Sequence, residues 1–333
     1  ALKQHFLSVR ATEEAAEGFD LFCEECAGLS LSEEKLHEYY DNVSWVSFPR
    51  GLKRRNALSL KKWRRQLAPA IEKEIFLQYI FQKQWQAVKA YANEKGISVI
   101  GDAPIFVSYD SADVWAHQKL FRLDSKGFPT CVTGVPPDYF SETGQLWGNP
   151  HYAWREHEKT GFAWWLSRIQ KNLQDVDILR IDHFRGFAGY YAIPYGDKTA
   201  ENGRWRTGPG YALFAAVKKE LGSPRIIAED LGFLTDDVRA LLKECAYPGM
   251  KVLEFAFDNP QGQSPYLPHR CIENCVYYTG THDNAPLSPW RSEAEPEALT
   301  FAAQYLGLNP QEGFCAGMLR GGMMTSAKLF VSQ

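Results

Sequence analysis

A series of short apolar segments, each followed by acidic or polar residues, constrains the fold of this 333-residue chain most strongly. The segments lie at 97–100, 176–181, 225–228, 250–255, 275–279 and 329–331. A longer helix is expected over 71–95, and amphipathic stretches lie between many of the later segments, at 162–173, 211–221, 236–245 and 293–305. Strands that alternate with helices predict βαβ units, and therefore an α/β fold with a parallel sheet.

Three of the expected strands are followed by carboxylates: Asp182, Glu229 and Asp283. A closed barrel of parallel strands would bring these carboxyl ends to one mouth, where barrel enzymes carry their chemistry. Glycoside cleavage with retention needs one carboxylate to attack the sugar and a second carboxyl to transfer the proton. An acidic residue after a strand is more often a helix N-cap or a surface group. Three such carboxylates after three strands, however, favour a shared site.

The neighbours of these carboxylates support the same interpretation. Arg180 and Asp182 are two residues apart on an expected strand, so both side chains point to the same side. A fixed cation there would keep Asp182 ionised, as a nucleophile requires. His183 and His282 flank the carboxylates and could donate hydrogen bonds to sugar hydroxyls.

The stretch 106–155 is rich in Gly, Pro, Asp and aromatic residues, and we interpret it as a long excursion above the strands. It carries side chains that suit the stacking and hydrogen bonding of sugars, namely Tyr139, Phe140, Trp147, Asp138, Gln145 and Asn149. The alternative is that the aromatic residues only pin a long loop to the barrel.

Composition excludes several classes of protein. The chain has 37 Lys and Arg against 40 Asp and Glu, a net charge of −3, which argues against nucleic acid or an anionic membrane as a partner. No apolar run approaches the ~18 residues of a membrane span. No signal-peptide pattern follows Ala1, and the seven cysteines form an odd set, so we expect free thiols and a cytoplasmic location.

The cysteines also bear on metal binding. Cys23 and Cys26 have the spacing of half a zinc site, but the other half would have to be Cys271 and Cys275, far along the chain. Two thiols on one helix are the simpler interpretation. We therefore expect no metal and no cofactor.

Several long strings resemble the 4-alpha-glucanotransferases of the amylomaltase, or disproportionating-enzyme, family, which is glycoside hydrolase family 77 of the alpha-amylase clan. The strings are GDAPIFVSYDSADVWAH (101–117), GVPPDYFSETGQLWGNPHY (134–152), LRIDHFRGF (179–187), IIAEDLGFLT (226–235), GMKVLEFAF (249–257) and YTGTHDN (278–284). They are long, ordered and specific.

The resemblance implies a TIM (β/α)8 barrel in which Asp182 is the nucleophile, Glu229 the acid/base and Asp283 the carboxylate that orients donor hydroxyls. It also implies substrate-binding roles, in the donor subsite for Arg180, His183 and His282, and in the acceptor-side loop for Tyr139, Phe140 and Trp147. Asp102, which matches the family's GDxPI strand end, and Asn284 are expected to bind substrate as well. The reaction would move maltooligosaccharyl units between alpha-1,4-glucans (maltooligosaccharides, starch, glycogen) through a covalent glucosyl-enzyme, without metal or nucleotide.

The chain departs from the family pattern in two respects. The first two barrel strands are not found, and Ala285-Pro286-Leu287 stands where the family usually has Asp-Thr-Thr or similar. We expect a helical insertion over 1–70 and a catalytic barrel portion over 71–333 that holds strands three to eight. We also expect the chain to be a fragment, or to be completed by a partner or by self-association.

Two other functions stay open at this point. An alpha-glucan hydrolase of the same clan would use the same carboxylates but let water reach the intermediate. An inactive, truncated remnant that only binds glucan would fit the absent strands and the altered segment at 285–287.

Overall fold

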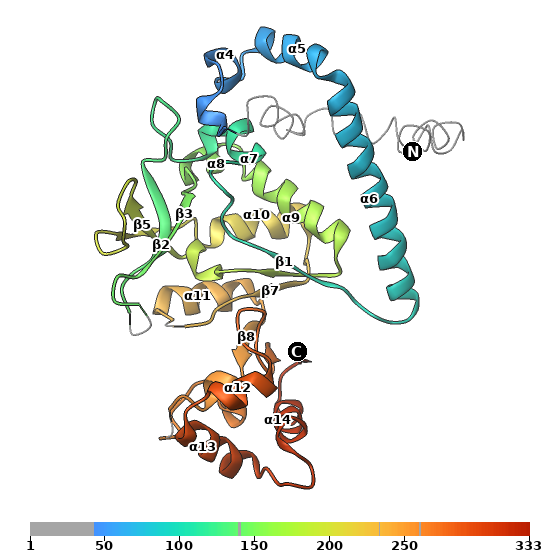
Figure 1. Cartoon of the computed structure of the whole chain (residues 1–333), viewed down its shortest axis with the longest axis vertical. Coiled ribbons are helices and arrows are strands. Elements are labelled where there is room, and N and C mark those ends of the chain that lie inside the picture. Colours follow the sequence, from blue (N-terminus) through green and yellow to red (C-terminus); the bar gives the residue numbers. More distant parts are fainter. Residues whose placement is uncertain (1–42, 139–140, 233, 260) are drawn as a thin grey trace.

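The structure is a computed structural model that describes residues 43–138, 141–232, 234–259 and 261–333. Its centre is a row of short parallel strands that follow one another in chain order (Figure 1). One sheet has the order β1-β4-β7, with bounds Ile100–Ala103, Ile178–Ile181 and Ile226–Ala228. The other has the order β8-β9-β10, with bounds Gly249–Val252, Cys275–Tyr278 and Leu329–Val331. The amide of Ala228 donates to Pro248 O, at 2.9 Å, and so joins the end of β7 to the approach to β8.

Two of the parallel strands, β7 and β9, are buried on both faces. Every residue of β7 and of β9 is buried, as expected of strands with helices packed over them. The register pairs Asp102 of β1 with Arg180 of β4, and Ile181 of β4 with Ala228 of β7. The carboxyl ends of these strands therefore lie at one edge of the sheet.

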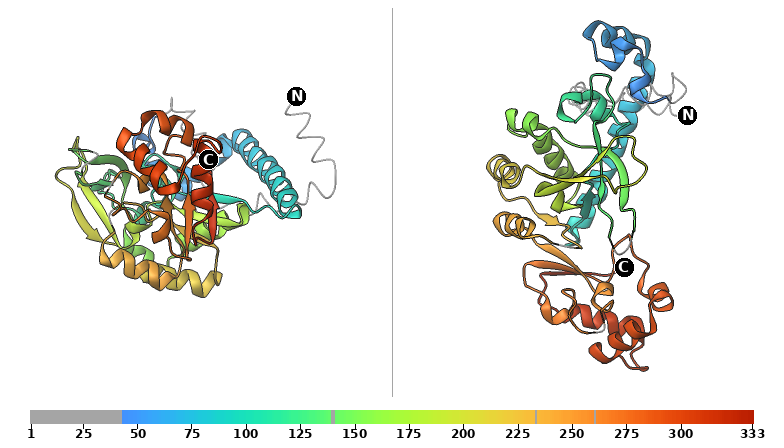
Figure 2. Two further views of the ribbon diagram at one scale, coloured as in Figure 1. Left: turned by 90° about the horizontal axis from the view of Figure 1, so that it is seen from below. Right: turned by 90° about the vertical axis from the view of Figure 1, so that its left-hand side faces the viewer.

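Three crossover helices connect the strands and cover one face. Their bounds are Ala163–Asp175 for α9, Tyr211–Leu221 for α10 and Asp236–Cys245 for α11. Figure 2 shows them stacked side by side against the strands. Each presents an apolar stripe to the sheet, for example Leu213, Phe214 and Val217 of α10, which are fully buried.

The C-terminal helices form a second core between β9 and β10. They are α12 (Leu287–Glu293), α13 (Pro296–Leu306) and α14 (Phe314–Met323). The expected helix over 293–305 is in fact the end of α12 and most of α13. The break follows from Pro296, which favours the first position of a helix and an extended residue before it.

A four-stranded antiparallel sheet, which was not predicted from the sequence, takes up part of the excursion at 106–155. Its order is β3-β2-β5-β6, with bounds Gln145–Pro150, Cys131–Val135, Gly189–Pro194 and Arg204–Thr207. Two strands, β2 and β3, come from the excursion, and β5 and β6 come from the connection after β4. Gly134 permits the close pairing of β2 with β3, because a Cβ at this position would collide with the backbone carbonyl of Gln145.

The N-terminal part of the described chain is helical. Its α-helices are α4 (Arg50–Lys53), α5 (Ala57–Gln66) and α6 (Ala68–Glu94), and two shorter ones follow β1 and β3, α7 (Ala112–Ala116) and α8 (Trp154–Lys159). Trp45, Phe48 and Leu52 are buried in the same core as the residues after β1. The long α6 is anchored by Trp85, whose indole N–H donates to Asp175 O at 2.7 Å.

The structure contains the predicted strands, but some of them begin or end at other residues than predicted. All the expected strands occur in the described residues, although the first begins only at Ile100 and the fourth ends at Val252, where a 3-10 turn follows. The two parallel sheets do not close within these residues, so the complete TIM barrel stays a prediction. In the same ranges, none of the helices is both long enough and apolar enough to cross a bilayer.

The packing of β4 generates a stability prediction. Leu179 is 1% exposed at the centre of the β1-β4-β7 sheet, whereas Leu58 on α5 is 79% exposed. Leu179→Ala should lower the free energy of unfolding by about 2–5 kcal/mol, because it leaves a cavity. Leu58→Ala, the matched control, should change it by less than about 0.5 kcal/mol. Urea denaturation followed by circular dichroism measures both, and equal shifts would contradict the assigned core.

Candidate active site

The ends of β4 and β7 bring Asp182 and Glu229 next to each other. The amide of Glu229 donates to Ile181 O at 3.0 Å, and the amide of Phe184 donates to Glu229 O at 3.0 Å. The backbone ladder therefore continues one step beyond the strands. The two acidic residues follow the paired residues Ile181 and Ala228, as parallel strands require.

Glu229 is buried and held by backbone amides. Its side chain accepts hydrogen bonds from the amide of His183 at 2.8 Å and from the amide of Leu231 at 2.7 Å. Burial raises the pKa of Glu229 to about 7, and the nearby Asp182 adds to the rise, although both amides and Arg180 oppose it. A carboxyl with this pKa can both give and take a proton near neutral pH.

His183 lies against the same carboxyl. Its backbone has φ 49°, in the left-handed region, and this turn directs its amide to Glu229. Burial and the nearby Arg185 lower the pKa of His183 to about 4, so the ring is neutral near pH 7. The Trp147 ring meets it edge-on, with centroids 4.9 Å apart.

Arg180 links two of the predicted site residues. Its Nη1 lies 2.7 Å from both carboxylate oxygens of Asp102, its register partner on β1, and its Nη2 lies 3.0 Å from Asp182 Oδ1. Arg180 thus contacts Asp182 as the two-residue spacing predicted. The net pKa of Asp182 is nevertheless raised, because burial outweighs the attraction of Arg180, and Asp102 and Asp283 add to the rise.

The loop after β9 carries Asp283 at the same end of the strands. The charge of Asp283 contributes to the raised pKa of Asp182, so the two lie within electrostatic reach. The side chains of His282 and Asp283 are largely exposed, at 67% and 74%. Asn284 closes the turn, since its Oδ1 accepts from the amide and the hydroxyl of Thr281.

The unusual segment at 285–287 has a structural explanation. Pro286 precedes α12, and the Leu287 side chain is buried in the core of the C-terminal helices. Apolar burial, and not contact with the cleft, accounts for the leucine.

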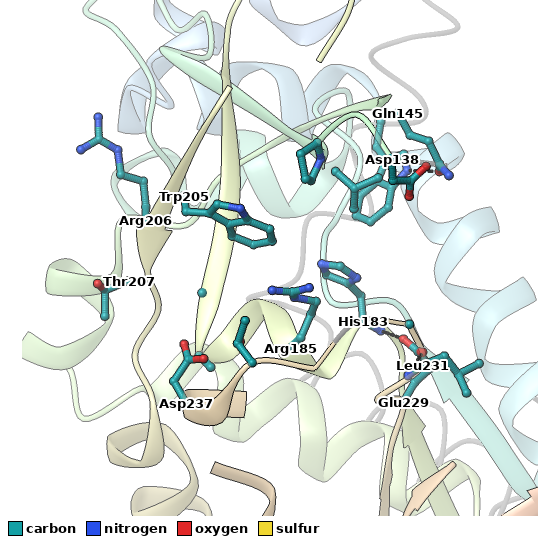
Figure 3. A pocket seen from close by; sticks show the side chains of 17 residues that line it. Asp138, Gln145, His183, Arg185, Trp205, Arg206, Thr207, Glu229, Leu231 and Asp237 are labelled. Carbon is teal, nitrogen blue, oxygen red and sulfur yellow. Dashed lines mark hydrogen bonds between the residues drawn. The ribbon is translucent and has the colours of Figure 1, made fainter. Parts of the chain in front are cut away.

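A cleft of about 650 Å³ opens beside Glu229 (Figure 3). Its lining includes five of the residues that sequence reasoning selected, namely Asp138, Gln145, Trp147, His183 and Glu229. Trp147 donates from its indole N–H to Gln145 Oε1 at 3.1 Å, which connects two of these side chains. Asp182 and Asp283 are not part of the lining.

Of the residues selected from the excursion, Asn149 has a structural role, and two lie outside the described residues. Asn149 lies outside the cleft lining and holds the excursion together, because its amide donates to Val107 O at 3.0 Å and its Oδ1 accepts from Thr133. Tyr139 and Phe140 lie outside the described residues, as do Cys23 and Cys26.

The structure also adds residues that sequence reasoning missed. Arg185 lines the middle of the cleft beside His183, and Trp205 and Asp237 line it across from Glu229. Arg185 lies three residues after Asp182 within LRIDHFRGF (179–187), a segment that resembles the family, so the sequence could have indicated it. Trp205 and Asp237 had no comparable signal. Within the described ranges, no cluster of three or more His, Cys, Asp or Glu side chains could hold a metal ion.

Comparison with known proteins identifies the family. The family model described as 4-alpha-glucanotransferase (glycoside hydrolase family 77) matches residues 1–333. The 4-alpha-glucanotransferase of Streptococcus pneumoniae (strain TIGR4) is 47% identical over 287 residues, which cover 86% of this chain and 57% of that protein. The chloroplastic/amyloplastic 4-alpha-glucanotransferase of Solanum tuberosum is 46% identical over 291 residues, with 87% of this chain and 50% of that protein covered.

A solved structure agrees with these relatives. Amylomaltase from Streptococcus agalactiae in complex with acarbose superposes with a TM-score of 0.94 at 37% sequence identity, covering 99% of this chain and 68% of that one. The chain spans about half the length of the curated relatives named above. Because the family model spans the whole chain and nearly half of the aligned positions are identical in these relatives, the chain belongs to the 4-alpha-glucanotransferase family.

Proposed function

We propose that this chain carries the catalytic centre of a retaining 4-alpha-glucanotransferase, which moves maltooligosaccharyl units between alpha-1,4-glucans such as maltooligosaccharides, starch and glycogen. The observation that carries the proposal is a buried carboxyl, Glu229, with a pKa of about 7, beside the carboxylate of Asp182. The names of the relatives, and the acarbose bound to the neighbouring structure, support the same chemistry.

The two carboxylates divide the reaction between them. Asp182 attacks the anomeric carbon of the donor while Glu229 gives its proton to the departing glycosidic oxygen, so the C–O bond breaks as an ester bond to Asp182 forms. Glu229, now ionised, then takes the proton from the hydroxyl of an acceptor glucan, whose oxygen displaces Asp182. Two inversions give net retention, and no cofactor is consumed.

The neighbouring residues position the donor. Arg180, fixed by Asp102, orients the Asp182 carboxylate. We assign Asp283, with His282 and Asn284, to the hydroxyls of the donor ring. The neutral His183 can donate one hydrogen bond to a sugar hydroxyl, and its amide holds Glu229.

The cleft receives the leaving or incoming glucan. Asp138, Gln145 and Trp147 form one wall. The family resemblance assigns acceptor binding to Tyr139 and Phe140 as well. Asn149 supports this wall from behind through its bond to Val107. The exposed aromatic ring of Trp147 suits stacking on a sugar.

We further propose that the parallel strands belong to a (β/α)8 barrel, with the helical part to residue 70 as an insertion. The two parallel sheets, β1-β4-β7 and β8-β9-β10, each in chain order, and the amylomaltase neighbour support this. Self-association is one source of the strands that would close it. A cytoplasmic location stays a prediction from the sequence.

Removal of either carboxylate tests the assigned roles. Glu229→Gln should lower kcat/KM for maltotriose by about 10²–10⁴-fold, the usual contribution of a positioned acid/base. Asp182→Asn should abolish measurable transfer, because no covalent intermediate can form. The matched control Glu220→Gln, at an exposed position on α10, should keep parent activity. The role of Asp182 is disproved by an Asp182→Asn variant that retains most of the transfer activity.

The pH profile should report Glu229. Below pH about 7 the carboxyl holds the proton that the leaving oxygen needs, and above it the proton is lost, so kcat/KM should fall by about tenfold per pH unit. Glu229→Gln should remove this alkaline limb. His183 cannot produce it, because its pKa is about 4.

Glu254 provides the control for the same experiment. It is buried just after β8, and burial together with the nearby Asp258 raises its pKa to about 7 as well. If Glu254→Gln, and not Glu229→Gln, removed the alkaline limb, the acid/base assignment would be wrong.

Incubation with maltotriose separates transfer from hydrolysis. We expect free glucose together with longer oligomers, resolved by chromatography. The exposure of His282 and Asp283 is the one observation that favours a hydrolase, because water can reach this side of the site. Progressive shortening to maltose and glucose without longer products would establish hydrolysis, and binding without turnover would indicate an inactive remnant.

A further inference from the structure

The side of the cleft opposite Glu229 carries a partly exposed tryptophan. Trp205 lies on β6, the edge strand of the antiparallel sheet, and is 44% exposed. Other tryptophans, such as Trp45, Trp115 and Trp165, are fully buried. Figure 3 shows the Trp205 ring directed into the cleft, with Arg185 close below it and His183 on the other side. Its exposure therefore opens onto a defined cavity.

Neighbouring side chains hold this ring in place. Trp205 pairs with Tyr191 of β5 in the strand register, and the two rings meet at an interplanar angle of 63° with centroids 5.3 Å apart. The guanidinium carbon of Arg185 lies 4.3 Å from the centre of the Trp205 ring, a cation–π contact. A ring fixed by such contacts loses little conformational entropy when a ligand binds.

The lining of the cleft indicates which part of the substrate it holds. Glu229, the proposed proton donor to the leaving oxygen, is part of the lining, whereas Asp182, the proposed nucleophile, is not. The leaving group and the acceptor occupy the side of the acid/base carboxyl. The cleft is therefore the acceptor side of the site, and Trp205 lies across it from Glu229, with Arg185 and His183 between them.

We propose that Trp205, positioned by Arg185, is an acceptor platform that contacts a glucose unit beyond the one joined in the reaction. The inference rests on the proposed function and adds a specificity-determining residue to it. The apolar face of a pyranose ring packs on an indole, and the carboxylate of Asp237 and the guanidinium of Arg185 are at hand for hydroxyl groups. An acceptor of several units reaches the platform, whereas glucose occupies only the position next to Glu229.

A donor without a sugar leaving group isolates the acceptor step. With α-maltotriosyl fluoride, formation of the maltotriosyl-enzyme breaks the C1–F bond, releases fluoride and leaves the cleft free for an added acceptor. Trp205→Ala should lower kcat/KM for maltotetraose as acceptor by about 3–10-fold, the range of an aromatic contact. The loss with glucose as acceptor should be several-fold smaller, and Trp205→Phe should restore part of the maltotetraose rate.

Controls separate this effect from misfolding and from unspecific loss of an aromatic residue. Tyr91→Ala removes an exposed ring from α6, outside the cleft, and should leave the ratio of the two acceptor rates unchanged. Urea denaturation of Trp205→Ala should give a transition close to that of the parent. If Trp205→Ala lowered both acceptor rates equally, or neither, the platform would be disproved.

Release of fluoride tests the proposed function independently of the platform. A parent chain that releases no fluoride lacks the proposed activity, and calorimetric titration with maltotetraose then decides about the platform, since binding needs no turnover. Weaker binding to Trp205→Ala than to the parent and to Tyr91→Ala would support the platform. Equal binding, or no binding to the parent, would overturn it.

Discussion

Backbone hydrogen bonds hold β4 between β1 and β7, in a register that pairs Arg180 with Asp102 and Ile181 with Ala228. The candidate site depends on this ladder, because its side chains are neighbours only through the pairing of segments far apart in the chain. A shift of one residue would turn Arg180 and Asp182 to the opposite face and separate both from Glu229. The fully buried residues on either side of these positions oppose such a shift.

Burial of charged groups at the ends of β4 and β7 is unfavourable, and hydrogen bonds to these groups offset part of the loss in solvation. Burial favours the neutral form of Glu229, yet two backbone amides bind its oxygens and keep the ionised form accessible. Arg180 is buried with two carboxylates in contact, so its charge is compensated. The result is two carboxyl groups in different environments, one bound to a cation and one enclosed, as the proposed roles of nucleophile and acid/base require.

Much of this arrangement could be predicted from the sequence, because parallel strands and amphipathic helices have strong local patterns. The segment 211–221 and the segment 236–245 match α10 and α11 at both ends. The antiparallel strands β5 and β6 could not be predicted in this way. Residues 189–194 form an unbroken apolar run without alternation, and 204–207 are exposed along an edge, so neither shows the period of a half-buried strand.

The site residues could be predicted only where a local sequence pattern determines their position. The positions of Asp182, Glu229 and Asp283 after expected strands predicted a shared site, because the carboxyl ends of parallel strands lie at the same edge of a sheet. Residue type alone could not distinguish Gln145, which lines the cleft, from Asn149, which ties down the excursion. Trp205 escaped notice because its position depends on pairing with Tyr191, a contact that only the folded antiparallel sheet creates.

The antiparallel sheet takes β2 and β3 from one crossover connection and β5 and β6 from the next. Its strands lie outside the parallel row, so changes along them leave the pairing of β4 with its neighbours intact. Selection can therefore reshape the proposed acceptor surface while the carboxylates to which we assign bond cleavage stay where they are. Divergence of chain-length preference among relatives would then accumulate in this outlying sheet, and the parallel strands would vary least.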